Sequence, residues 1–235
     1  MIIDFNDINY YFLTCNNQKR KSHMLELFKN YKLTEVNPVS TEIGISKEQS
    51  GSTGFSKMLD LAVKNQNRNT PFQPFVLLED DVNICKKFPD NLNIPDDTDI
   101  LYIGISSSGM QSSDISGSGR CIRYTSVNGY SEIVKVYNML STHGFIVCSL
   151  TGLITLQKCL FEDFYRNRGY DMSLAHIQPH INAYALRTPL VYQWKPLGGW
   201  EIETNIRLTN DSTETIPEKW INKRNLTFLT IHNNS

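Results

Sequence analysis

The sequence has little of several features that mark common protein classes. It contains five cysteines among 235 residues, an odd number without a CxxC pair, which argues against a disulfide framework or a structural zinc site and for a reducing compartment. No apolar run approaches the roughly 18 residues that a membrane span needs. The first residues include acids and no basic flank before an apolar core, unlike a secretory signal. These absences predict a cytoplasmic protein with no membrane span.

Neither sign of charge is in excess. The 23 basic and 24 acidic side chains give a net charge of −1, so no overall field attracts nucleic acid or an anionic membrane. The densest basic group, Lys19 to Lys21, is short and lacks the aromatic ladder of single-strand binders. We therefore expect no nucleic-acid partner. With 40% hydrophobic residues, the chain can bury a full core as one α/β domain.

The most informative stretch is FVLLEDDV, residues 75–82, in which an apolar run leads into Glu79, Asp80 and Asp81. An uninterrupted apolar run of this length is typical of a strand buried on both faces of a parallel sheet. The three acids then lie at the carboxyl end of the strand, the edge where open α/β sheets hold ligands. Clustered carboxylates repel one another unless a hard cation such as Mg2+ or Mn2+ neutralises them. The alternative is a solvated acidic turn.

Strands and helices are expected to alternate along the chain. Apolar runs predict strands at residues 8–14, 75–82, 99–105 and 144–149, and helical spacing predicts helices at 19–31, 55–65, 151–165 and from 171 onward. Gly51 to Gly54 is interpreted as a break before the second helix. A Ser/Gly segment at residues 106–119 is either a linker or a lid. This alternation predicts an α/β fold with a mostly parallel central sheet and helices on both faces.

Six segments, in this order and spacing, resemble the lipopolysaccharide and collagen galactosyltransferase family, whose members have the GT-A fold. They are GSTGFSKML (51–59), FVLLEDDV, DILYIGI (99–105), STHGFIVCS (141–149), YDMSLAHI (170–177) and TPLVYQ (188–193). Two departures are Lys57, where the family usually has histidine, and a DxD-type motif in the form Glu79-Asp80-Asp81. The combination is also similar to capsid-decorating glycosyltransferases of large DNA viruses of algae.

The resemblance implies a GT-A-like domain over residues 1–207, followed by a polar extension over 208–235. Within that extension NLTFLTIHNN is similar to YYFLTCNN near the start of the chain. One interpretation is that a further catalytic domain begins there in a longer polypeptide, and the other is a chance similarity between two apolar strands.

The implied activity is that of a metal-dependent glycosyltransferase. It would move a sugar from a nucleotide-diphosphate donor, expected to be UDP-linked, to a hydroxyl of a glycan or glycoprotein, with Mn2+ or Mg2+ stabilising the leaving diphosphate. Competing classes are a catalytically silent nucleotide-sugar or glycan-binding module and a metal-dependent phosphatase or nuclease. Asp81 is expected to be the direct metal ligand, with Asp80 or Glu79 giving a second oxygen or binding the ribose. His176 and His180 are candidates for a third ligand.

Further site residues are expected on both sides of the acids. Asp171 is the candidate base that removes the proton of the acceptor hydroxyl, and its alternative role is a helix N-cap. The nucleotide contacts predicted after the first strand are Thr14, Asn16 and Arg20. A second donor-side group, in which glycine allows close approach and lysine reaches a phosphate, consists of Gly51, Ser52, Ser56 and Lys57.

Overall fold

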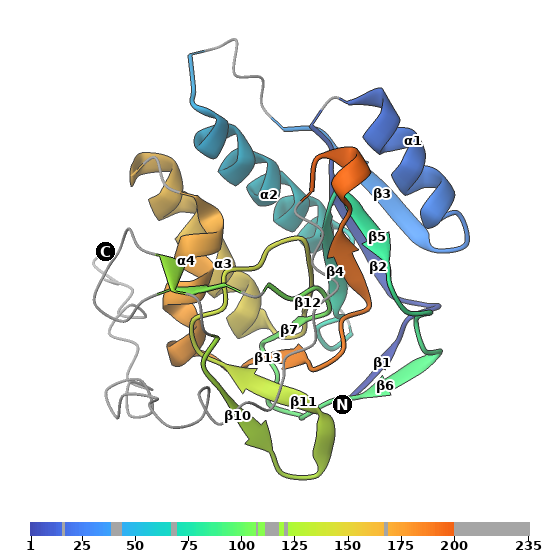
Figure 1. Ribbon diagram of the computed structural model, residues 1–235, viewed down its shortest axis with the longest axis vertical. Coiled ribbons are helices and arrows are strands. Elements are labelled where there is room, and N and C mark those ends of the chain that lie inside the picture. The colour runs from blue at the N-terminus through green and yellow to red at the C-terminus, as the bar shows by residue number, and fades with distance from the viewer. Residues whose placement is uncertain are drawn as a thin grey trace.

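The structure, a computed structural model, is built around a sheet of eight strands in the order β10-β11-β13-β7-β12-β4-β2-β3 (Figure 1). It describes residues 1–199 apart from 16, 39–43, 67–69, 107, 111–117, 120–121 and 167–168. The predicted extension at 208–235 lies outside these residues. The eight strands are β2 (Asn9–Leu13), β3 (Lys32–Val36), β4 (Phe75–Glu79), β7 (Ile100–Tyr102), β10 (Tyr124–Val127), β11 (Tyr130–Val136), β12 (Gly144–Val147) and β13 (Ala183–Leu186).

The sheet is mixed rather than purely parallel. Strand β2 is parallel to both neighbours, β3 and β4, and β13 is parallel to β7. Strand β12 lies between β4 and β7 and runs antiparallel to both, while β11 is antiparallel to β10 and β13. Among these eight strands, β11 and β12 therefore run against the other six. The α/β class is confirmed, with a sheet in which one direction predominates.

The central strands are buried along their whole length, as their apolar sequences predict. All residues of β7, β12 and β13 are buried. In β4, Leu77 packs into the core on one face of the sheet, and Val76 and Leu78 pack into the core on the other. A strand with two buried faces has no polar side chain until it leaves the sheet. The run in β4 reaches that point at Glu79.

Helices cover both faces of the sheet (Figure 1). One face carries α2 (Lys47–Lys64), α3 (Leu150–Arg166) and α4 (Tyr170–Ile177), which bury Phe55, Leu156 and Leu174 among others. The opposite face carries α1 (Gln18–Leu27), which buries Met24. The prediction of helices on both faces is confirmed. None of the helices in the described part of the chain combines the length and apolar content needed to cross a bilayer.

Helix α2 begins eight residues earlier than expected. Its N-cap is Ser46, whose side chain accepts from the Gln49 backbone while the Gln49 side chain accepts from the Ser46 backbone, forming a capping box. Gly51 and Gly54 therefore lie inside the helix, and their interpretation as a break was wrong. A Cβ added at Gly54 would come within 2.3 Å of the Leu13 side chain, so this glycine allows α2 to pack closely on β2.

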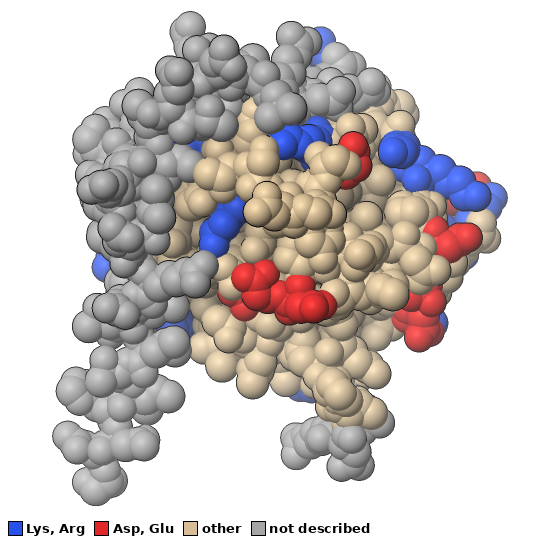
Figure 2. Space-filling view, turned by 90° about the horizontal axis from the view of Figure 1, so that it is seen from below, with Lys and Arg blue, Asp and Glu red and all other residues tan. Residues whose placement is uncertain are grey.

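Short elements complete the fold beside the main sheet. They are β1 (Ile2–Asp4) with β6 (Asn91–Asn93), β5 (Val82–Ile84) with β14 (Val191–Gln193), β8 (Gly109–Met110) with β9 (Ser118–Gly119), and the 3-10 helices η2 (Gln178–His180) and η3 (Lys195–Leu197). The β8 strand lies in the first part of the Ser/Gly segment, and its Met110 is buried and hydrogen-bonded to Asn138. That part of the segment is thus packed against the domain. On the face in Figure 2, acidic and basic side chains form small separate groups.

Candidate functional site

The acidic motif lies in the tight connection between β4 and β5. Asp80 and Asp81 are only 3% and 7% exposed, so the interpretation of the motif as a solvated turn was wrong. Charged carboxylates are rarely buried without partners. The contacts of each acid therefore decide what the motif can do.

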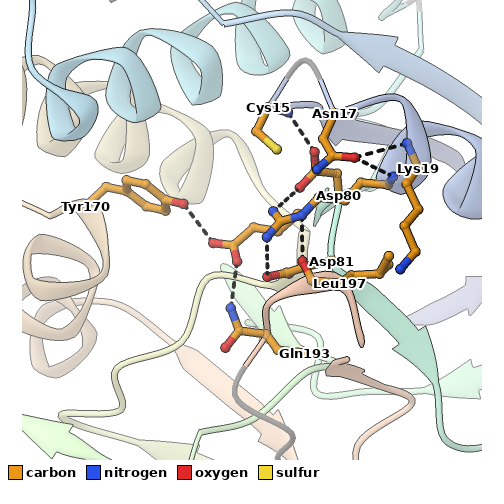
Figure 3. A network of polar contacts seen from close by, with 10 residues as sticks. Cys15, Asn17, Lys19, Asp80, Asp81, Tyr170, Gln193 and Leu197 are labelled. Carbon is orange, nitrogen blue, oxygen red and sulfur yellow. Dashed lines mark hydrogen bonds and ion pairs between the residues drawn. The ribbon is translucent and has the colours of Figure 1, made fainter. Parts of the chain in front are cut away.

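Both oxygens of Asp80 are occupied by protein groups (Figure 3). Oδ2 accepts from the backbone N–H of Cys15 at 2.6 Å, and Oδ1 accepts from Nη1 of Arg20 at 2.8 Å. Arg20 also donates from Nε to the carbonyl oxygen of Leu197 at 2.7 Å. Asp80 thus joins the end of β2 to α1, and Arg20 joins both to the segment that follows β14.

Asp81 differs from its neighbours because one of its oxygens has no partner. Within the described residues, Oδ1 is buried without a hydrogen bond, and Oδ2 lies 3.9 Å from Nη2 of Arg20. Burial and the negative charge of Glu79 raise the pKa of Asp81 to about 7, although Arg20 opposes the shift. A buried carboxylate with a vacant oxygen and a raised pKa gains stability from a cation. Of the three acids, Asp81 has the contacts expected of a metal ligand.

Glu79 is bound by three side-chain donors. Its Oε1 accepts from the hydroxyl of Thr142 at 2.6 Å. The same oxygen accepts from the hydroxyl of Tyr170 at 2.7 Å, and Oε2 accepts from the amide of Gln193 at 3.0 Å (Figure 3). Burial raises the pKa of Glu79, the three hydrogen bonds act against this, and Asp171 adds to it. With these donors in place, the predicted role of Glu79 as a ribose contact or second metal ligand has little support in its surroundings.

Asp171 lies in the first turn of α4, directly after the Tyr170 that binds Glu79. The N-cap of this helix is Gly169, which has no side chain, so the N-cap alternative for Asp171 was wrong. Its Oδ1 accepts from the backbone N–H of Met172 at 2.8 Å. Burial raises its pKa, a shift that its backbone hydrogen bonds oppose. A carboxyl group with a raised pKa is a stronger base than an exposed one.

A pocket of about 220 Å3 opens at the carboxyl ends of β2 and β3, next to the start of α1. Its lining residues are Thr14, Asn17, Gln18, Lys21, Glu35 and Asn37. Thr14 is 1% exposed, and its Oγ1 has no hydrogen-bond partner among the described residues. The structure thus places Thr14 at the pocket and Arg20 in the first turn of α1, against the acids. Asn16 lies outside the described residues.

The second predicted donor-side group lies on α2, where its members have different surroundings. The missing side chain of Gly51 makes room for the ring of Tyr170, since a Cβ there would be 3.0 Å from Cε1. Ser52 is 1% exposed, and Ser56 is partly buried. Lys57 is exposed and donates from Nζ to the carbonyl oxygen of Asn37 at 3.3 Å. Lys57 therefore lies beside the pocket, whereas Gly51 packs in the interior.

The structure does not bring His180 to the acids. His180 ends η2, just before β13, and β13 runs in the same direction as β4. It therefore lies at the opposite edge of the sheet from the carboxyl end of β4. Within the described residues, no three His, Cys, Asp or Glu side chains are grouped so that they could hold a metal ion. A cation at Asp81 would need its other ligands from the donor and from water.

Sequence reasoning missed the residues that surround Glu79. Thr142, Tyr170 and Gln193 lie 63, 91 and 114 positions away in the chain. Nothing in their spacing predicts a meeting, although each falls in a segment that carried the family resemblance. His143 was missed too: its Nε2 is buried without a partner in the described structure, and burial lowers its pKa to about 4.

No protein-family model matches this chain, and no curated protein matches it significantly. The function of the protein is therefore inferred from the geometry of the acidic motif, the pocket and α4.

Proposed function

We propose that the protein is a metal-dependent glycosyltransferase that takes a sugar from a nucleotide-diphosphate donor, UDP-linked in the simplest case, and passes it to a hydroxyl of a glycan or glycoprotein. The observation that carries the proposal is the buried Oδ1 of Asp81 at the carboxyl edge of the sheet, which has no hydrogen-bond partner in the described part of the chain. The pocket lined by Thr14 opens at the same edge, where α/β sheets hold nucleotides.

The residues present fit Mg2+ or Mn2+ if the donor completes the coordination. Mg2+ in nucleotide sites is commonly held by one or two carboxylates, substrate phosphates and water, without a full protein cage. Asp81 supplies one such carboxylate, whereas Asp80 is engaged by Arg20. When bound, the cation would offset the negative charge that develops on the departing diphosphate.

The protein side chains bind and orient the two substrates. The pocket beside Thr14 is large enough for part of a nucleoside, and its amide, hydroxyl and charged groups offer donors and acceptors. Lys57, beside the pocket, carries a positive charge suited to phosphate. On the opposite side, Asp171 takes the proton of the acceptor hydroxyl, a task favoured by its raised pKa.

Calorimetric titration of UDP with and without Mn2+ tests this function. We expect binding that depends on Mn2+ in the wild type and is weakened at least tenfold in Asp81→Asn. The matched control is Asp60→Asn, an exposed carboxylate of α2, which should bind as the wild type does. Because Asp81 has a pKa of about 7 and must lose its proton to hold a cation, affinity should rise roughly tenfold from pH 6 to pH 8.

Turnover separates an enzyme from a silent binding module. Hydrolysis or transfer from a panel of nucleotide sugars, followed as release of the nucleoside diphosphate, should occur in the wild type. It should fall at least a hundredfold in Asp171→Asn, while UDP binding is retained. UDP binding that does not depend on Mn2+, or an absence of UDP binding, contradicts the proposal. Metal-dependent binding without turnover indicates the silent binding module instead.

A further inference from the structure

The carboxylate of Glu79 connects four separate parts of the chain. It ends β4 and receives hydrogen bonds from Thr142, which precedes β12, from Tyr170 in α4 and from Gln193 at the end of β14. Tyr170 and Gln193 approach the end of β4 from different elements (Figure 3). Hydrogen bonds to a charged group are among the strongest that side chains form. Glu79 is therefore a point at which the relative positions of these elements are fixed.

The hydrogen bond from Tyr170 connects Glu79 to the neighbour of Asp171 in α4. The ring of Tyr170 packs on Phe55 of α2, with ring centroids 4.4 Å apart, and lies over the site left open by Gly51. Packing holds the ring, and the hydroxyl is then aimed at Glu79. Because Asp171 is the next residue of the same helix, the place of Tyr170 determines where the Asp171 backbone lies.

The hydrogen bond from Gln193 connects Glu79 to the segment that contacts Asp81. Gln193 donates to Glu79, and the next residue, Trp194, donates its backbone N–H to the carbonyl oxygen of Asp81 at 2.7 Å. The ring of Trp194 in turn stacks on His23 of α1, with centroids 4.9 Å apart. The segment after β14 is thus fixed between Glu79, Asp81 and α1.

We infer that Glu79 is a positioning residue, which through Tyr170 and Gln193 sets the distance between the candidate base Asp171 and the candidate metal ligand Asp81. It touches neither donor nor acceptor, and its contribution is to the geometry in which they react. Small displacements of reacting groups lower rates strongly while leaving binding nearly intact. The inference depends on the proposed function for the meaning of the two acids.

The variant Tyr170→Phe tests this role because it removes one hydroxyl and keeps the packed ring. We expect kcat to fall about tenfold, as for loss of one hydrogen bond to a charged group, with KM for the nucleotide sugar and Mn2+-dependent UDP binding within twofold of the wild type. Hydrogen exchange should become faster over residues 170–177, the span of α4. Tyr165→Phe, at a tyrosine of α3 that is 71% exposed, is the matched control and should change none of these.

A second variant removes a different hydrogen bond to the Glu79 carboxylate. Gln193→Ala removes the donor to Oε2 and should also lower kcat with little change in KM. A rise in KM at constant kcat in either variant would mean that Glu79 contacts the donor, and wild-type values in both would mean that it positions nothing; each result overturns the inference. If the wild type shows no turnover and no UDP binding, the proposed function fails. Hydrogen exchange tests the positioning role separately, because unchanged exchange over α4 in Tyr170→Phe counts against that role whatever the function is.

Discussion

The Arg20–Asp80 pair allows a quantitative prediction, because it is enclosed on several sides. The Asp80 side chain is 4% exposed and the Arg20 side chain 21% exposed, with 2.8 Å between Nη1 and Oδ1. Arg20→Met keeps most of the aliphatic side chain and removes the guanidinium. It leaves Asp80 with a single donor, the Cys15 backbone, and it leaves the carbonyl of Leu197 without its Arg20 donor.

The expected cost follows from these losses. Removing one partner of a buried ion pair costs about 3–5 kcal/mol, and the partial exposure of Arg20 places the effect near the lower end. We predict that the free energy of unfolding falls by about 3 kcal/mol. In a double-mutant cycle with Asp80→Asn, the coupling energy between the two positions should be about 2 kcal/mol, since the second substitution removes the uncompensated charge.

Urea denaturation followed by circular dichroism measures both quantities. The control is Lys29→Met, just beyond α1, where the ion pair with Glu26 is 60% and 75% exposed on its two sides; exposed pairs of this kind contribute little to stability. A coupling energy below about 0.5 kcal/mol, or an Arg20→Met variant as stable as the Lys29→Met control, would refute the reasoning.

Two further predictions concern stability. Burial lowers the pKa of His143 from 6.5 to about 4, so the unfolded chain binds the proton at a higher pH than the folded protein does. Stability is therefore lost as the pH falls from 6.5 towards 4. The loss is about 3 kcal/mol at about 1.4 kcal/mol per pKa unit. Urea denaturation at pH 7 and pH 4 should show a smaller difference in stability between the two pH values for His143→Leu than for the wild type. Equal pH dependence in these two proteins would contradict the prediction. Gly152→Ala should lower the free energy of unfolding by about 2 kcal/mol, because its Cβ would lie 2.4 Å from the backbone oxygen of Asp99. Thermal melts should show a smaller loss for Gly51→Ala, because its Cβ would lie 3.0 Å from Cε1 of Tyr170, a less severe overlap.

The central strands were predictable because their sequences fit a buried strand and no other type of element. The runs of β7 and β12, and the first four residues of β4, carry no charged side chain and match strands buried on both faces. The long helices α1 and α3 followed from apolar spacing. The position of β12 between β4 and β7 did not, because the order of strands depends on tertiary packing that no local pattern encodes.

Two misses had readable local signals. The hairpin of β10 and β11 turns at Asn128-Gly129, a dipeptide that favours a two-residue hairpin loop, and Gly129 has the positive φ of 81° that such a turn needs. The true start of α2 was marked by Ser46 and Gln49, three residues apart as in a capping box. For α2, Gly51 and Gly54 were given more weight as a break than their place inside the helix supports.

The candidate site was predictable only in part. The acids and Asp171 were found because carboxylates after a strand or near a helix start are visible in the sequence. Their separate roles were not, because Glu79 and Asp81 are two residues apart yet have different surroundings. Glu79 accepts from three donors, whereas Oδ1 of Asp81 has no hydrogen-bond partner among the residues that the structure describes. Those surroundings come from segments more than sixty residues away, so only the fold distinguishes the two acids.

The antiparallel strand β12 also has a consequence for how the protein is made. Strands β4 and β7 are synthesised by residue 102, but the strand that joins them is residues 144–147. During elongation, both strands therefore keep a hydrophobic edge with unpaired backbone groups while some forty more residues are added, about 2–8 s at typical translation rates. Such edges pair readily with other chains, which makes this interval the period when a nascent chain is most exposed to aggregation and most dependent on chaperones.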